Sequence, residues 1–238
     1  MGERRRVDGQ PGFVLHGYPY RETSLIVDVF SRDHGRVALM ARGARRPRSA
    51  LRGLLMGFQP LELGWAGGGE VLTLMKAEWV GGLPLLTDRA LFVGYYLNEL
   101  LINLLPREDA HPKLYDAYLE MLHALSEGVR ESDLRRFEKV LLQELGYGLT
   151  LSHDRNGEPI DADRWYRYEI EHGALPVTAD ETGSQCVRGQ TLLDMERGDF
   201  SDAVSGMQAK QLMRNLMHYY LDGKVLETRK IFRELQDL

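Results

Sequence analysis

The sequence contains very little cysteine and no long apolar run. Cys186 is the only cysteine in 238 residues, so an intramolecular disulfide is excluded and a reducing compartment is favoured. The longest apolar stretches, such as Leu100–Leu105, are far shorter than the roughly 20 residues that cross a bilayer. No apolar segment of the signal-peptide kind follows the first residues. We therefore expect a cytoplasmic protein.

Motifs for catalysis are also lacking. The sequence has no phosphate-binding glycine loop, no dinucleotide-binding glycine pattern, no paired-histidine metalloprotease motif and no serine nucleophile elbow. The seven histidines are scattered, and a single cysteine can form neither a multi-cysteine zinc site nor a redox pair. Asp161 and Asp163 are explained more simply as turn residues than as metal ligands. We expect neither an enzyme nor a bound cofactor or metal.

Charge is unevenly distributed along the chain. The net charge is −5, yet residues 1–80 carry 12 Lys and Arg against 8 Asp and Glu, whereas residues 81–238 carry 18 against 27. No acidic residue occurs from His34 to Leu61. Because affinity for phosphate follows the local potential, a DNA contact is expected on one face of the N-terminal part.

Arginines are concentrated in that acid-free stretch. The segment Ala41–Ser49 combines them with Gly43 and Pro47, which favours a solvent-exposed loop over a central strand or a regular helix. Arginine is suited to bidentate phosphate contact, so we predict a nucleic-acid interface; a merely solvated charge run is the simpler alternative. The predicted DNA-contacting residues here are Arg36, Arg42, Arg45, Arg46, Arg48 and Arg52. Tyr18 and Tyr20 are surface candidates for base stacking, whereas Phe30, Phe58 and Trp65 fit a barrel core equally well.

The hydrophobic pattern indicates two kinds of architecture. Up to about Val80, short β-rich segments are separated by glycine: 13–16 before a break at Gly17 and Pro19, 24–30, 36–40, and a hairpin of 60–63 with 71–75 around Gly67–Gly69. In 24–30 the side chains are expected to alternate between two faces of a strand. About five short strands suggest a small closed barrel, of the OB or the SH3-like kind.

After Thr87 the pattern has a helical period. Helices are expected over about 87–105 and 114–125, from a Ser132 N-cap to Leu145, and over about 207–221 and 228–235, with 150–186 irregular. The expected fold is α+β, with an all-β domain over 1–82 followed by a mainly helical domain over 83–238 that carries an irregular, zinc-less insert at about 150–190.

Several stretches, taken in order, resemble the RecO family of recombination mediators. They are Phe13–His16, Tyr20–Ser24, Asp28–Phe30, Gly35–Val37, Ala41–Arg45, Phe58–Leu61, Tyr96–Leu101, Leu134–Glu138, Leu145–Gly148, Ala209–Arg214 and Gly223–Arg229. The resemblance implies an N-terminal OB-fold, binding of single- and double-stranded DNA, and annealing of complementary strands. It also implies two protein partners, the acidic C-terminal tail of the single-stranded DNA-binding protein SSB and RecR, with which such proteins help to load RecA. The protein would then be associated with the nucleoid when bound to DNA.

The resemblance also bears on individual residues of the helical part. Lys210 and Arg214 are added to the predicted DNA contacts, and the tail-binding arginine of the family falls on Arg135. With Leu134, Phe137 and Lys139 it gives a predicted tail site of apolar and cationic side chains near a helix start. Some members of the family carry a four-cysteine zinc site, which this sequence lacks.

Two other functions remain open on the sequence alone. The chain could be a protein-interaction scaffold whose arginine loop meets an acidic partner in place of DNA. A nuclease or deaminase would require clustered carboxylates or a His/Cys metal set, which is not found in the sequence.

Overall fold

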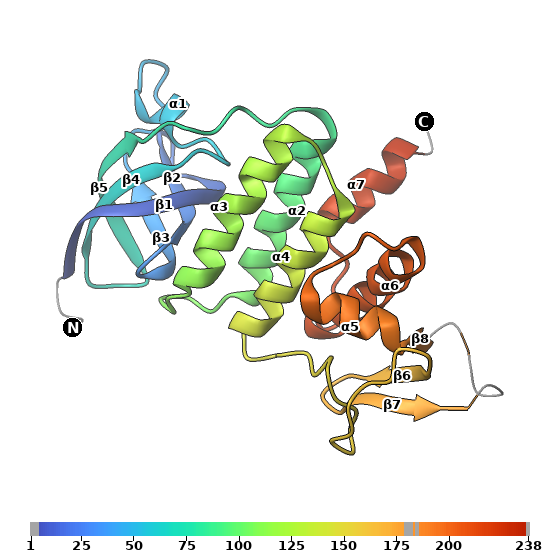
Figure 1. Ribbon diagram of the computed structural model, residues 1–238. Helices are drawn as coiled ribbons and strands as arrows, with labels where there is room; N and C mark the ends of the chain where they lie inside the picture. The colour runs from blue at the N-terminus through green and yellow to red at the C-terminus, as the bar shows by residue number, and fades with distance from the viewer. Residues whose placement is uncertain (1–4, 179–182, 184–185, 237–238) are drawn as a thin grey trace. The chain divides into compact units, whose positions relative to one another are not determined.

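The N-terminal strands close into a five-stranded barrel in the computed structural model, which describes residues 5–178, 183 and 186–236 (Figure 1). The order around the barrel is β1-β2-β3-β5-β4. The strands are β1 (Arg5–Tyr20), β2 (Ser24–Ser31), β3 (Gly35–Ala41), β4 (Leu61–Gly67) and β5 (Val71–Trp79), with a short helix α1 (Leu51–Leu54) between β3 and β4. This OB-like barrel and the glycine hairpin between β4 and β5 confirm the prediction. The expected break at Gly17 and Pro19 is wrong, because β1 continues to Tyr20 and Pro19 lies exposed near its end, where a missing amide N–H is tolerated.

Residues 12–15 of β1 and 27–31 of β2 are buried on both faces of the sheet. Val27 and Val29 belong to the barrel core, which includes the fully buried Trp65. On the opposite face, Phe13 and Phe30 contact the ring of Tyr115, with ring centroids 5.4 and 5.5 Å apart. The predicted alternation in 24–30 is therefore correct, and its second face is covered by helices.

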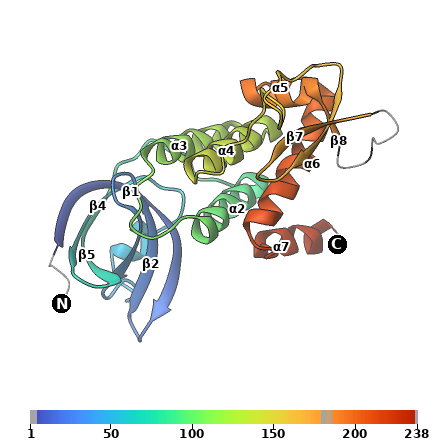
Figure 2. The ribbon, with the colours of Figure 1, turned by 90° about the horizontal axis from the view of Figure 1, so that it is seen from below.

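Three further helices belong to the same compact unit as the barrel; this unit comprises Met1–Val129 and Leu226–Leu238. They are α2 (Asp88–Leu104), α3 (Pro112–Glu127) and α7 (Glu227–Gln236), and Figure 2 shows α7 beside α2. The buried Asn98 of α2 donates to the Leu15 carbonyl oxygen at 2.8 Å and accepts from the Tyr118 hydroxyl of α3. This unit therefore extends beyond the expected boundary at residue 82, and a DNA-binding domain over 1–82 stays a prediction.

The second unit, Arg130–Val225, combines helices with a small sheet. It contains α4 (Glu131–Glu144), β6 (Trp165–Glu169), β7 (Gly173–Val177), β8 (Cys186–Arg188), α5 (Gly189–Arg197) and α6 (Ala203–Tyr220). The sheet has the order β7-β6-β8, so the expectation of irregular structure over 150–186 is wrong, and α5 was not predicted. Helix α4 begins at Glu131, with Arg130 and not Ser132 at the N-cap position. None of the helices among the described residues is both long and apolar enough to cross a membrane.

The turn between β2 and β3 is joined closely to the segment after α2. Gly35 has φ +63°, and a Cβ atom there would lie 1.9 Å from the Asp109 carbonyl oxygen. Beside it, the Glu108 N–H donates to the Arg36 carbonyl oxygen at 3.0 Å. Only glycine satisfies both the backbone angle and this close approach.

We therefore predict that Gly35→Ala destabilises the fold by at least about 3 kcal/mol, because strain and a steric clash add. Gly9→Ala is a matched control, since Gly9 has φ +67° but nothing lies within 4 Å of its added Cβ. The control substitution should lower the free energy of unfolding by about 1 kcal/mol, the scale of the strain from a left-handed backbone conformation alone. Urea unfolding measures both, and equal losses would show that the contact with Asp109 is unimportant.

Candidate nucleic-acid interface

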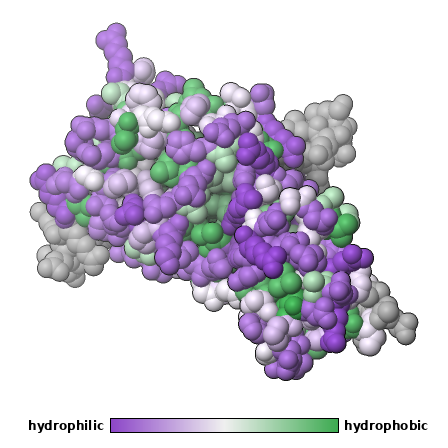
Figure 3. Space-filling view, in the orientation of Figure 1, coloured by the Kyte–Doolittle hydropathy of each residue, from purple (hydrophilic) through white to green (hydrophobic). Residues whose placement is uncertain are grey.

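The arginine-rich loop that follows β3 is an ordered series of turns. The amide N–H groups of Arg46, Ser49 and Arg52 donate to carbonyl oxygens three residues earlier, at 3.0–3.2 Å. The Arg45 N–H donates to the Thr23 carbonyl oxygen at 2.8 Å, which ties the loop to the turn between β1 and β2. The backbone is thus held at one end of the barrel while the side chains extend outward. The projecting loop of Figure 1 is hydrophilic in Figure 3.

Five predicted DNA-contacting arginines are exposed in and beside this loop. They are Arg42, Arg45, Arg46, Arg48 and Arg52, which we call the loop arginines. Among the described residues, no carboxylate forms an ion pair with any of them; the one side-chain bond found joins the Arg45 guanidinium to the Arg21 carbonyl oxygen at 3.2 Å. Five uncompensated positive charges on a fixed loop make a strong local site for polyanions.

Arg36 is a correction to the predicted set. Its side chain is only 13% exposed, and its guanidinium donates to the Ile102 carbonyl oxygen at 2.7 Å and lies 4.0 Å from the buried Asp28 carboxylate. It therefore joins the barrel to α2 and is not presented to a ligand. Sequence spacing could not reveal this, because Ile102 lies 66 residues away.

An exposed aromatic side chain that the sequence did not single out lies at the end of β5. Trp79 is 61% exposed, and its indole N–H donates to the Gln59 side-chain oxygen at 3.0 Å, which orients the ring. Helix α1, which follows the arginine loop, contacts β5. Of the earlier stacking candidates, Tyr18 is 44% exposed, whereas Phe30, Phe58 and Trp65 are buried. An exposed flat ring is suited to stacking on unpaired bases.

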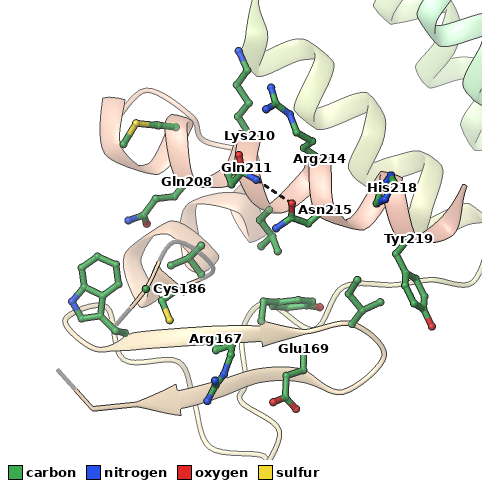
Figure 4. Close-up of a pocket in the computed structure, with 17 residues that line it drawn as sticks. Arg167, Glu169, Cys186, Gln208, Lys210, Gln211, Arg214, Asn215, His218 and Tyr219 are labelled. Carbon is green, nitrogen blue, oxygen red and sulfur yellow. Dashed lines mark hydrogen bonds between the residues drawn. The ribbon is translucent and has the colours of Figure 1, made fainter. Parts of the chain in front are cut away.

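Lys210 and Arg214 lie on α6, in the second unit, on the border of a groove of about 980 Å³ between α6 and the strands β6 and β8. Figure 4 shows both side chains pointing away from the strands, with Cys186 between helix and sheet. Lys210 pairs with Glu131 at 3.1 Å, while Arg214 is exposed. These two cations therefore belong to the second unit, whereas the arginine loop belongs to the first.

The predicted tail-binding residues on α4 are engaged within their own unit. Arg135 is 8% exposed and forms an ion pair with Glu138, which is 1% exposed. Lys139 donates to the carbonyl oxygens of Met195 and Glu196 at the end of α5, where a cation stabilises free helix carbonyls. Phe137 is buried, and Leu134 is half-buried. Of the four, Leu134 and Lys139 are thus the two that are not buried.

A zinc ion does not fit the residues of the small sheet. Cys186 is the sole thiol, and among the described residues no group of three or more His, Cys, Asp or Glu side chains could hold a metal. Hydrogen bonds organise the segment before the sheet. The Asp154 carboxylate accepts hydrogen bonds from the amide N–H groups of Asn156 and Glu158. The Tyr166 hydroxyl oxygen accepts a hydrogen bond from the amide N–H of Asp161.

Comparison with known proteins identifies the family. The model described as "Recombination protein O N terminal" matches residues 9–83, and "Recombination protein O C terminal" matches residues 89–225. The chain belongs to the RecO family. It is 65% identical to the DNA repair protein RecO of Dechloromonas aromatica strain RCB and 57% identical to that of Aromatoleum aromaticum, in both cases over the full length of both chains. RecO of Azoarcus sp. strain BH72 is 53% identical over the same share. Membership of the RecO family supports a role in DNA repair and recombination.

The pair of Arg135 and Glu138 leads to a prediction about stability. Arg135→Ala would take the guanidinium away from the buried Glu138 carboxylate, and removing one partner of a buried ion pair typically costs about 3–5 kcal/mol. The double variant Arg135→Met with Glu138→Leu removes both charges and should recover most of that loss. Chemical unfolding of the two variants tests this, and a fully stable Arg135→Ala protein would contradict the pairing.

Proposed function

We propose that the chain is a non-enzymatic recombination mediator that binds single- and double-stranded DNA through its loop arginines and anneals complementary strands. The observation that carries this proposal is the set of five exposed guanidinium groups on a loop hydrogen-bonded to the barrel, none of which pairs with a carboxylate in the part of the chain that the structure describes. Phosphate contacts supply most of the affinity in sequence-independent DNA binding, and guanidinium groups suit them well. An OB-like barrel offers the kind of surface along which a single strand runs.

The protein partners that we propose are the SSB tail and RecR, with loading of RecA as the outcome. The family resemblance supports them, and it supports a cytoplasmic, nucleoid-associated location. A tail site around Leu134, Arg135, Phe137 and Lys139 has the required apolar and cationic groups near the start of α4. A tail carboxylate there would have to share Arg135 with Glu138. Because Arg135→Ala disturbs this pair, loss of tail binding in that variant has to be judged beside its stability.

The alternative function is a scaffold whose arginine loop binds an acidic protein. The positive charge of the loop alone supports binding of an acidic protein and binding of DNA equally. Trp79 and Tyr18 are exposed on the same barrel and favour DNA, because aromatic rings stack on bases. Competition separates the two: an acidic peptide of equal charge should displace single-stranded DNA only weakly.

The direct test replaces Arg42, Arg45, Arg46 and Arg48 with Ala. If each contacts one phosphate, the slope of log K against log salt for single-stranded DNA should flatten by roughly 0.7 per contact. The matched control replaces the same four with Lys, which keeps the charge and should retain most of the slope. A slope that is unchanged in the Ala variant would show that the loop does not face DNA.

A further inference from the structure

A hollow lined by three tyrosines lies at the end of α6, within the second unit. Its volume is about 500 Å³. Tyr219 and Tyr220 end α6, Tyr147 follows α4, Glu171 lies in the turn between β6 and β7, and Asp222 follows α6. We call this the tyrosine hollow; His218 and Gly223 complete its lining. Figure 4 shows Tyr219 extending from α6 toward the side of the strands, opposite to Lys210 and Arg214.

The rings of the tyrosine hollow hold one another in place. Tyr147 and Tyr220 are stacked, with centroids 4.1 Å apart and planes 20° apart, and Tyr219 meets Tyr220 edge-on at 5.3 Å and 84°. Even so, Tyr219 remains 49% exposed and Tyr147 44% exposed. A cluster of aromatic rings that packs together and yet stays open to solvent is typical of a binding site.

Two carboxylates are held at the same place by uncommon backbone conformations. Glu171 has φ +67° and Asp222 has φ +52°, a region that few residues other than glycine adopt. The Tyr219 hydroxyl donates to the Glu171 carboxylate at 3.1 Å, and this hydrogen bond raises the pKa of Tyr219, so that the phenol stays neutral. No Lys or Arg is among the described residues that line the hollow. The site therefore combines neutral aromatic faces with negative charge.

We propose that the tyrosine hollow binds an arginine side chain presented by a basic segment of a partner protein. A cation is attracted to the face of an aromatic ring, and a planar guanidinium can stack on tyrosine while it pairs with a carboxylate. Glu171 and Asp222 would repel phosphate, so nucleic acid is disfavoured at this surface. The hollow thus serves protein contact, whereas the arginine loop of the other unit serves DNA.

The test titrates the full-length protein, labelled at tyrosine for NMR, with the tripeptide Gly-Arg-Gly and with the same peptide containing citrulline. Citrulline has nearly the same shape as arginine but no charge. We expect saturable shifts of the Tyr147, Tyr219 and Tyr220 ring signals with the arginine peptide, and affinity weaker by at least about tenfold with citrulline, the scale of a lost charge-assisted hydrogen bond. Equal affinities for the two peptides would overturn the proposal.

Variants separate the contributions of charge and ring. Glu171→Gln should lower the affinity for the arginine peptide by at least about fivefold. Glu158 is an exposed carboxylate of the same unit outside the hollow, so Glu158→Gln should leave the affinity unchanged. Tyr219→Ala should weaken binding by roughly two- to fivefold, the scale of an exposed cation–π contact. Tyr219→Phe keeps the ring and should restore most of that loss. If Glu158→Gln weakens binding as much as Glu171→Gln does, the loss of affinity comes from the overall charge of the unit, and the assignment of the binding site to the tyrosine hollow is wrong.

Two further arms test the identity of the ligand. A single-stranded oligonucleotide should not shift the tyrosine ring signals, and saturable shifts at these rings would make the hollow part of a nucleic-acid surface. The ring signals of the free protein should also be independent of protein concentration. A concentration dependence that disappears when the loop arginines are replaced with Ala would mean that a second copy fills the hollow, which would overturn the proposal of a different partner.

Discussion

The burial of residues 12–15 of β1 and 27–31 of β2 on both faces is the constraint on which the first unit depends. One face builds the barrel core around Trp65, and the other places Phe13 and Phe30 against Tyr115 and Tyr118. A strand with two apolar faces must be covered twice, so α2 and α3 are required on the outside of the barrel. Burial raises the pKa of both tyrosine hydroxyls, which therefore stay neutral in this contact. The arginine loop lies at the barrel end where the turn between β1 and β2 is its neighbour, and its charges stay in water.

The main elements could be predicted because each follows a regular local pattern. Alternation in 24–30, the glycines at 67–69 and the helical period after Thr87 correspond to β2, the hairpin and α2. The sheet of the second unit could not be predicted in this way. Its strands have three to five residues, which is too short for a clear alternation of apolar and polar side chains. The segment is also fixed by close backbone contacts, such as the one directly after β8, where a Cβ added at Gly189 would lie 1.9 Å from the Asp161 carbonyl oxygen.

The candidate sites differ in the same way, because some follow from a local sequence pattern and others depend on contacts between distant residues. A run of arginines with Gly43 and Pro47 is a local signal, and it correctly indicated an exposed cationic loop. Whether a single cation is free depends on partners remote in sequence, such as Ile102 for Arg36 or Glu196 for Lys139. The tyrosine hollow brings together residues from the segment after α4, the β6–β7 turn and the end of α6, so only the folded chain reveals it. A cation in the sequence is therefore a weaker indication of a ligand than a cation without a partner in the structure.

The central claim, that DNA is bound at the arginine loop, is tested most directly by amide hydrogen exchange of the intact protein with and without single-stranded DNA. The amides of Arg45, Arg46, Ser49 and Arg52 are hydrogen-bonded in turns, so a ligand that holds the loop should slow their exchange. The account predicts slower exchange over 42–52 and the neighbouring turn 21–23, with no change in α4. Slower exchange confined to α6 around Lys210 and Arg214, with the loop unchanged, would contradict it.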